Sequence, residues 1–190
     1  MSLLEASSVV RGMFATRSTI DGAGATVPLH SCIDVGTAEA LYRQVRARHP
    51  RLAVEIGMAN GISTLAILTA LAENGGEGQL ISIDTNQSTQ WHDCGRAAVA
   101  RAGLAGRHRV LEKPDALALP DLLAADTRID FGYIDGWHTF DYALVDFWFL
   151  AKMTPRGGVI AFNDCGWPAV ARAIRFVQTH RRYRELDGGL

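Results

Sequence analysis

The sequence has little cysteine: its 190 residues include only Cys32, Cys94 and Cys165, which are odd in number and far apart. They form no CxxC spacing, so neither a disulfide framework nor a zinc site with thiolate ligands is supported. The N-terminus has no basic segment followed by a long apolar run, as a signal peptide would have. The longest apolar stretches are also too short to span a bilayer. These absences predict a reduced, cytoplasmic setting with no membrane partner.

A surplus of charge of either sign is also missing. The 19 lysines and arginines nearly balance the 20 acidic residues, and the net charge of −1 gives no indication of a nucleic-acid partner. Several arginines gather near the C-terminus, and we interpret them as a solvated helix face with a tail. The hydrophobic fraction of 48% is ordinary for a globular chain, and the length suits one domain.

The first part of the chain differs from the rest in its pattern. Residues 1–35 have weak periodicity and several turn-forming residues, so we expect an N-terminal arm or lid with a short helix near Leu3–Phe14. A helix is then expected over Thr37–Arg48, with Pro50 marking its exit. Residues 36–190 are expected to form the main domain.

After residue 50, apolar runs of strand length alternate with segments of helical period. The expected strands are Leu52–Ile56, Gln79–Ile83, His108–Leu111, Ile129–Ile134 and Val159–Phe162. The expected helices are Ser63–Glu73, Trp91–Ala102, Ala116–Ala125, Phe140–Lys152 and Ala169–Thr179. Strands that are apolar throughout are typical of a parallel sheet buried on both faces. The succession predicts an α/β fold, a doubly wound, mostly parallel sheet with helices on both faces, in which ligands bind beyond the carboxyl ends of the strands.

A glycine-containing loop follows the first of these strands. Gly57 and Gly61 permit a tight turn, a close approach of the backbone to a ligand, and exposed N–H groups at the helix start. Ala59 and Ile62 stand where a dinucleotide fingerprint would need its second and third glycines. Glu55 would lie badly beside a pyrophosphate, and it suits a ligand that carries an ammonium group. The alternative is a generic strand–turn–helix connection.

Acidic residues follow the next two strands. Asp84 ends the second strand, at a distance from the glycine loop that fits one βαβ unit. A carboxylate there is the usual partner of the two hydroxyl groups of a ribose, and the alternative is an aspartate that begins a helix-capping turn. Asp115 follows the third strand, where it either caps the next helix or contacts an adenine.

The ends of the fourth and fifth strands carry a polar cluster. If the strand order is 3-2-1-4-5, these ends are neighbours, and Asp135, Asn163 and Asp164 converge there. Oxygen ligands without sulfur suit a hard divalent cation such as Mg²⁺, Ca²⁺ or Mn²⁺, and the alternative is a metal-free polar pocket. His138 is either a base that takes a proton from a substrate hydroxyl or only a residue at a helix start.

As a set, these segments resemble one family. They are the E-x-G-x-x-x-G loop, Asp84, the Asp135-Gly-Trp-His138 segment, and the run from Pro155 to Asp164. The set is similar to class I S-adenosylmethionine-dependent methyltransferases with a Rossmann-like fold. Within that class it is most similar to macrocin-type sugar O-methyltransferases and cephalosporin-biosynthesis methyltransferase-like proteins. The resemblance extends from about Val27 to Val177.

The resemblance implies a role for each matching position. Glu55 and the glycine loop would hold the methionine part of S-adenosylmethionine, Asp84 the ribose, and Asp115 the adenine edge. The implied cofactor-binding residues are Glu55, Gly57, Met58, Ala59, Asn60, Gly61, Ser63, Asp84, Thr85, Asp115, Ala116 and Asp135. Asp135, Asn163 and Asp164 would match the metal-binding residues of metal-dependent O-methyltransferases. His138 falls where catechol-type enzymes carry a lysine base and sugar-type enzymes a histidine.

From these roles we expect S-adenosylmethionine-dependent, metal-assisted O-methylation of a hydroxyl group on a small molecule. Asp135 and His138 would be the catalytic residues. The alternatives are a non-catalytic S-adenosylmethionine-binding protein that acts through an oligomeric interface, and a nicotinamide-dependent oxidoreductase.

The chain departs from the family pattern in two places. Ala59 replaces the middle glycine of many members. A sixth strand, over Tyr183–Leu186, would only be starting where the chain stops at Leu190, so the antiparallel strands that usually finish the sheet are expected to be missing or incomplete. Either the chain is truncated, or a partner subunit of a homo-oligomer completes the pocket.

Overall fold

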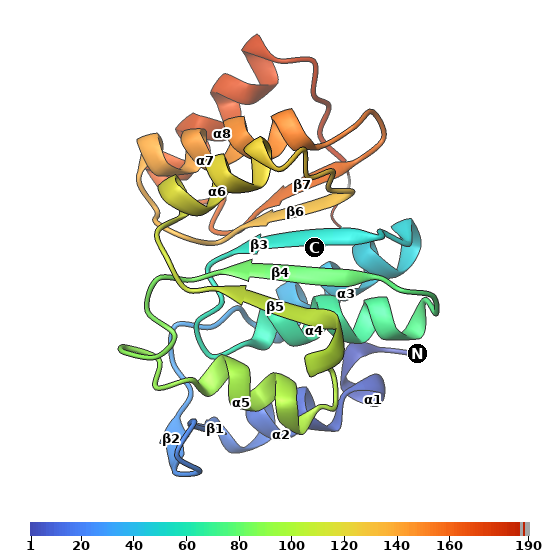
Figure 1. The fold of residues 1–190 in the computed structure, drawn as a ribbon, viewed down its shortest axis with the longest axis vertical. Coiled ribbons are helices and arrows are strands. Elements are labelled where there is room, and N and C mark those ends of the chain that lie inside the picture. Colours follow the sequence, from blue (N-terminus) through green and yellow to red (C-terminus); the bar gives the residue numbers. More distant parts are fainter. Residues whose placement is uncertain (187, 189–190) are drawn as a thin grey trace.

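A parallel sheet organises the chain in the computed structural model, which describes residues 1–186 and 188. The strands are β3 (Leu52–Ile56), β4 (Gln79–Ile83), β5 (His108–Leu111), β6 (Phe131–Ile134) and β7 (Val159–Phe162). Their order is β5-β4-β3-β6-β7, and every neighbouring pair in this sheet is parallel (Figure 1). This order confirms the predicted doubly wound α/β fold.

Helices cover both faces of the sheet, as expected (Figure 1). One face carries α3 (Val35–Arg48), α4 (Ile62–Glu73) and α5 (Cys94–Arg101), and the other carries α6 (Asp115–Ala124), α7 (Phe140–Met153) and α8 (Pro168–His180). Successive residues of a strand point to opposite faces, so Ala53 packs in the first core and Val54 in the second. Both faces therefore need apolar residues, which is why the central strands β3 and β6 are largely apolar, whereas the edge strand β5 carries His108 and the exposed Arg109.

After residue 50 most element boundaries lie within one residue of the expectation, but α5 and β6 begin later. Helix α5 begins at Cys94 rather than Trp91, because the preceding loop holds His92 and Asp93 at positive φ angles of 46° and 58°. Strand β6 begins at Phe131 rather than Ile129, which is buried just before it.

The register of the strands brings their carboxyl ends level. Ile56 pairs with Ile83 on one side and with Ile134 on the other, and Ile134 pairs with Phe162. The direction in which the chain adds strands reverses between β3 and β6, at the centre of this edge. Residues that follow the strands therefore meet at a topological switch point, where ligands bind in open α/β sheets.

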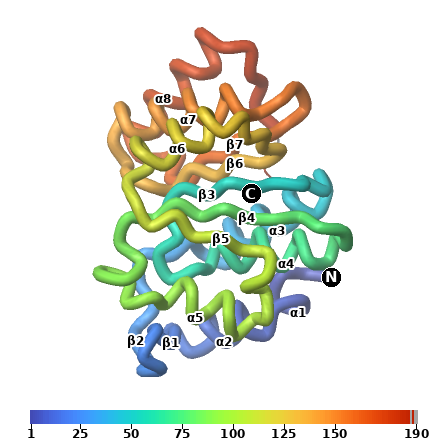
Figure 2. The backbone as a smooth tube through the Cα atoms, in the orientation of Figure 1, coloured from blue at the N-terminus to red at the C-terminus, as the bar shows by residue number. Residues whose placement is uncertain are grey.

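The N-terminal segment packs on the α3–α4 layer, on the opposite side of the sheet from α8 (Figure 2). It forms α1 (Leu3–Ala6), α2 (Ser8–Thr16) and a hairpin of β1 (Ser18–Ile20) and β2 (Thr26–Pro28). The sequence predicted one helix here, but Ser7 divides it: its hydroxyl accepts a hydrogen bond from the Val10 N–H and so caps α2. Leu3, Val10 and Met13 are buried.

The C-terminal antiparallel strands are missing from the described residues, as expected, and Tyr183–Leu186 do not start a sixth strand. The Tyr183 ring packs edge-on against Phe147 of α7, and Glu185 accepts a hydrogen bond from Gln178 of α8, so the segment turns back along these helices. Its charged residues leave too few apolar side chains to cover a sheet edge. The positions 187 and 189–190 lie outside the described residues. In the described part of the chain, no helix is long and apolar enough to cross a membrane.

Candidate functional site

A cavity of about 740 Å³ opens at the carboxyl ends of the sheet strands. Its wall comes from residues 56–63 after β3, 83–86 after β4, 135–138 after β6, and 163–164 after β7, with residues 31–34 closing one side. This volume is within the usual range for a small-molecule site. The cavity therefore lies where the fold predicts a ligand.

The charge of this cavity has one sign. Its lining includes Asp34, Asp84, Asp115, Asp135 and Asp164, whereas no lysine or arginine of the described residues lines it. Such a wall attracts a cationic ligand and repels a pyrophosphate, because the field of several like charges adds inside a concave, partly dry site.

Glycines shape the loop between β3 and α4. Gly57 has a φ of +86°, and a Cβ there would lie 2.1 Å from the Asp135 carbonyl oxygen, so only glycine fits. Gly61 has a φ of +87° and precedes α4 without any side-chain cap. The first N–H groups of α4, including that of Ser63, have no intrahelical acceptor. They are available to an anionic group such as a carboxylate.

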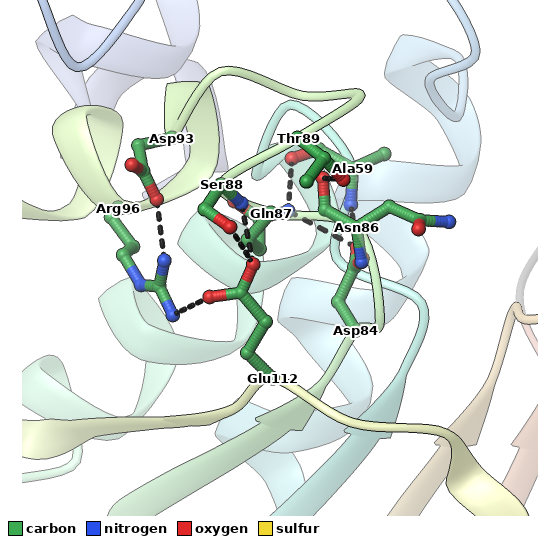
Figure 3. Close-up of polar contacts among 9 residues, drawn as sticks. All are labelled: Ala59, Asp84, Asn86, Gln87, Ser88, Thr89, Asp93, Arg96 and Glu112. Carbon is green, nitrogen blue, oxygen red and sulfur yellow. Dashed lines mark hydrogen bonds and ion pairs between the residues drawn. The ribbon is translucent and has the colours of Figure 1, made fainter.

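Ala59 holds a positive φ of 45° in the middle of this loop, and two side chains brace it (Figure 3). The Ala59 N–H donates to Asp84 Oδ2 at 2.8 Å, and the Ala59 carbonyl accepts from Gln87 Nε2 at 2.8 Å. Gln87 also donates to Asp84 Oδ2 at 3.1 Å, and so does the Met58 N–H at 3.0 Å. In this structure Asp84 therefore anchors the glycine loop through its Oδ2 atom.

Asp84 still faces the cavity with its second oxygen. Oδ1 accepts one recorded hydrogen bond, from the Asn86 N–H at 2.8 Å, which leaves it the capacity to accept from a ligand hydroxyl. Thr85 lies beside it in the wall.

An outer network fixes the loop after β4 to the end of β5 (Figure 3). Glu112 accepts hydrogen bonds from the Ser88 N–H and hydroxyl and pairs with Arg96 at 2.7 Å. Arg96 also pairs with Asp93. The Ser88 hydrogen bonds, with help from Arg96, lower the pKa of Glu112 to about 2. This network holds the brace of the glycine loop in place.

Glu55, predicted to hold an ammonium group, does not line the cavity. Its carboxyl is fully buried behind the wall, and Oε2 accepts hydrogen bonds from the hydroxyls of Thr64 and Ser82, each at 2.7 Å. Burial raises the pKa of Glu55 to about 7. The aspartates of the cavity are better placed than Glu55 to meet a ligand cation directly.

The polar cluster predicted after β6 and β7 does come together. The Asn163 amide donates to Asp135 at 2.8 Å and to Asp164 at 3.1 Å. His138 Nε2 lies 2.5 Å from Asp164 Oδ2 and 3.8 Å from Asp135 Oδ1. Atoms of Asp135, His138 and Asp164 lie within 4.8 Å of one another, close enough to share a metal ion.

The cluster is electrostatically coupled. Burial raises the pKa of Asp135 above its ordinary value, although hydrogen bonds from His138 and Asn163 oppose this. The hydrogen bond to Asp135 and the charge of Asp164 raise the pKa of His138. The imidazole is therefore a stronger base than a free histidine.

Asp115 lines the far end of the cavity from the first turn of α6. It is the first helical residue and not the cap, which is Pro114. The Ala116 N–H donates to Asp115 Oδ1 at 2.7 Å. Ala116, which was also predicted to bind the cofactor, is exposed and does not line the cavity. Its backbone N–H contributes only this hydrogen bond to Asp115.

Sequence reasoning missed two parts of the site. One is Gln87, which is fully buried and whose type and position carry no signal in the sequence. The other is the start of α3 with the segment before it, which together contribute Ser31, Cys32, Ile33, Asp34 and Thr37 to the wall. A signal existed there: Asp34 caps α3 by accepting from the Thr37 N–H at 2.8 Å, and an aspartate before a helical pattern is a typical cap.

Comparisons with known proteins agree with this geometry. The model of a family described as "methyltransferase domain" matches residues 54–165. The fold is similar to an O-methyltransferase from Bacillus cereus in complex with SAH, at 19% identity and a TM-score of 0.71, covering 92% of this chain and 80% of that one. It is also similar to the O-methyltransferase TomG from Streptomyces achromogenes, involved in tomaymycin synthesis and solved with SAM. There the identity is 19% and the TM-score 0.68, with 94% of this chain and 78% of that one covered. No curated protein matches the sequence.

Proposed function

Since the chain belongs to the methyltransferase domain family whose model matches residues 54–165, we propose that it transfers a methyl group from S-adenosylmethionine to a hydroxyl group of a small molecule. The observation that carries this proposal is the cavity with five aspartates and no lysine or arginine in its described lining. S-adenosylmethionine brings a sulfonium and an ammonium group, which such a wall attracts. The pyrophosphate of a nicotinamide cofactor would be repelled by the same wall.

The residues present fit the parts of this cofactor. The uncapped N-terminus of α4 suits the carboxylate of the methionine part, and Asp135 lies near enough to the loop to meet its ammonium group. Asp84 Oδ1 suits the ribose hydroxyls, and Asp115 suits the amino group of adenine. Gly57 lets the backbone of the loop approach the ligand closely.

His138 is the base in this proposal. Its imidazole takes the proton from the acceptor hydroxyl, and Asp164, 2.5 Å from Nε2, stabilises the imidazolium that forms. Asp135 holds the ring from the other side. S-adenosylmethionine, when bound, supplies the methyl group that the deprotonated oxygen accepts. The cavity contributes by placing donor and acceptor side by side.

The same cluster suits a divalent cation. Asp135 and Asp164 offer carboxylate oxygen atoms, which Mg²⁺ and similar hard cations prefer, while Asn163 turns its amide nitrogen toward both carboxylates. When bound, such an ion would lower the pKa of a coordinated acceptor hydroxyl. Asp135 and Asp164 would hold it, Asn163 would join them once its amide turns its oxygen to the ion, and His138 keeps its role as base.

Titration calorimetry tests the cofactor first. We expect S-adenosylhomocysteine to bind and NAD not to bind at the same concentrations, and Asp84→Asn to weaken binding. Thr89→Ala is a control at the same loop, because this exposed side chain neither lines the cavity nor contributes to the brace of Ala59. Tight binding of NAD without binding of S-adenosylhomocysteine would refute the proposal.

Methyl transfer to a panel of small hydroxyl acceptors tests the chemistry. We expect EDTA to inhibit the transfer, added Mg²⁺ to restore it, and Asp135→Ala to abolish it. Full activity in EDTA would exclude the metal but leave methyl transfer by the His138–Asp164 pair intact. Tight cofactor binding with no transfer to any acceptor would point instead to a non-catalytic binding protein.

A further inference from the structure

A carboxyl group that the proposed reaction does not use is buried behind the cavity wall. Asp146 lies in the middle of α7 and is 0% exposed. No described residue donates a hydrogen bond to either of its side-chain oxygens. An ionised carboxylate buried without donors is very costly, so the side chain has to be neutral or shared with a neighbour.

That neighbour is Asp115, which lines the cavity at the start of α6. Both carboxyl groups lie beside Gly136: a Cβ on it would be 3.8 Å from Asp146 Oδ2 and 3.9 Å from Asp115 Oδ2. Among the described residues, Asp115 is the titratable group that acts on Asp146. Burial, together with the charge and contact of Asp115, raises the pKa of Asp146 to about 8.

The surroundings decide which of the two aspartates holds the proton. Asp115 accepts a hydrogen bond from the Ala116 N–H at 2.7 Å and begins α6, so a donor and the positive end of the helix dipole both lie beside it. Asp146 has neither advantage. Two adjacent carboxyl groups do not both ionise readily. Near neutral pH, Asp146 therefore carries the proton, and Asp115 is the acceptor for it.

We propose that Asp146 is a positioning residue: its carboxyl donates a hydrogen bond to Asp115 and thereby aims the Asp115 carboxylate at the amino group on the cofactor's purine ring. The pair would then select a 6-aminopurine against a 6-oxopurine. A 6-oxo group cannot donate to a carboxylate, and sites built around such a bond reject analogues that lack the donor. This inference rests on the proposed function, because it requires that the cavity binds S-adenosylmethionine.

Two ligands and two substitutions test the pair. The ligands are S-adenosylhomocysteine and S-inosylhomocysteine, in which a carbonyl oxygen replaces the amino group, and the variants are Asp146→Asn and Asp146→Leu. Calorimetry gives the preference for the adenosyl ligand. We expect the ratio of the two affinities to be about ten-fold smaller in the leucine variant than in the wild type, which corresponds to the loss of one hydrogen bond to a charged group. The asparagine variant, which can still donate, should keep it.

The pH profile separates positioning from a structural role. Between pH 7 and pH 9 the wild type should lose about ten-fold more affinity for S-adenosylhomocysteine than the asparagine variant, because only the wild type loses the Asp146 proton. The asparagine variant also corrects for the titration of the ligand's own amino group. The leucine variant should unfold at an equal or higher temperature, since an apolar side chain replaces a buried carboxyl.

Each result supports or contradicts the proposal that Asp146 positions Asp115. A leucine variant with the wild-type preference, or an asparagine variant with the wild-type pH profile, would overturn the role of Asp146. If the leucine variant does not fold, the pH profile of the asparagine variant decides the question. A wild type that binds both ligands equally refutes the inference alone. A wild type that binds neither refutes the proposed function, and the inference falls with it.

Discussion

Glu55 shows how a single buried side chain couples this protein to pH. Its carboxyl is enclosed between β3 and α4, where the hydroxyl groups of Thr64 and Ser82 donate to one of its oxygens. Burial outweighs these hydrogen bonds and raises the pKa of Glu55 to about 7. The folded protein therefore retains a proton that the unfolded chain releases near its ordinary value of 4.5.

This proton predicts the sign of one contribution to stability. Where the folded state binds more protons than the unfolded state, stability falls as pH rises, here from about pH 4.5 to about pH 7. Glu55→Gln should remove this contribution, so that urea unfolding at pH 8 gives a free energy higher than that of the wild type by up to roughly 3 kcal/mol. At pH 4 the difference should vanish.

Glu112→Gln is the matched control with the opposite sign. Hydrogen bonds from Ser88 lower the pKa of Glu112 to about 2, so its contribution is present above pH 4.5 and is lost as pH falls toward 2. The glutamine variant at this position should thus be less stable than the wild type at pH 8. A Glu55→Gln variant that loses stability at pH 8 would show that the buried charge is compensated.

At the scale of elements, the cofactor loop depends on a neighbouring loop. Ala59 has a positive φ of 45°, which costs an alanine about 1 kcal/mol or more. Asp84 holds its N–H and Gln87 its carbonyl. The glycine loop after β3 is therefore kept in shape by the loop after β4.

Gln87→Leu tests that support. The leucine keeps the size of the side chain but leaves the Ala59 carbonyl without its donor and takes one donor from Asp84. We expect stability to fall by about 1–3 kcal/mol in urea unfolding, and affinity for S-adenosylhomocysteine to fall about ten-fold in calorimetry. Gln79→Leu makes the same change at an exposed position and should alter neither value. Unchanged affinity in a destabilised Gln87→Leu variant would show that the ligand itself restores the loop.

The elements and the site were predictable to different degrees. Apolar runs predict β3, β4, β5 and β7 with their observed bounds, because a strand in a sheet that is covered on both faces carries apolar residues at successive positions. The end of each strand then locates Asp84, Asp135 and Asp164. The brace by Gln87 and the pairing of Asp146 with Asp115 were not predictable, since both depend on contacts between side chains far apart in the sequence. The segment Tyr183–Leu186 starts no strand, because two apolar residues in a charged run do not require a sheet partner.

At the scale of the whole molecule, residues 1–35 form an N-terminal segment that packs on the main domain. The sequence suggested an arm or lid, which stays a prediction. In the structure, α1 and α2 lie against the α3–α4 layer, and Glu39 of α3 accepts a hydrogen bond from the Leu3 N–H at 2.8 Å. Only the end of the segment, residues 31–34, reaches the cavity. The packing therefore gives α1 and α2 a share in the core, and leaves the cavity wall to the end of the segment.

Met13→Ala distinguishes a packed segment from a mobile lid. Met13 is 2% exposed in the core beneath α2, so its truncation should cost about 2–5 kcal/mol and lower the unfolding temperature by roughly 10 °C. Affinity for S-adenosylhomocysteine, measured where the variant is fully folded, should stay within about two-fold of the wild type, because Met13 does not line the cavity.

Leu117→Ala is the control: this side chain is 60% exposed on α6, and its loss should change stability by less than about 0.5 kcal/mol. If Met13→Ala instead weakens cofactor binding strongly while the unfolding temperature stays the same, α2 works as a lid whose position the ligand senses. A large loss of stability with normal binding would place α2 in the scaffold, and any closing motion would then belong to residues 31–34.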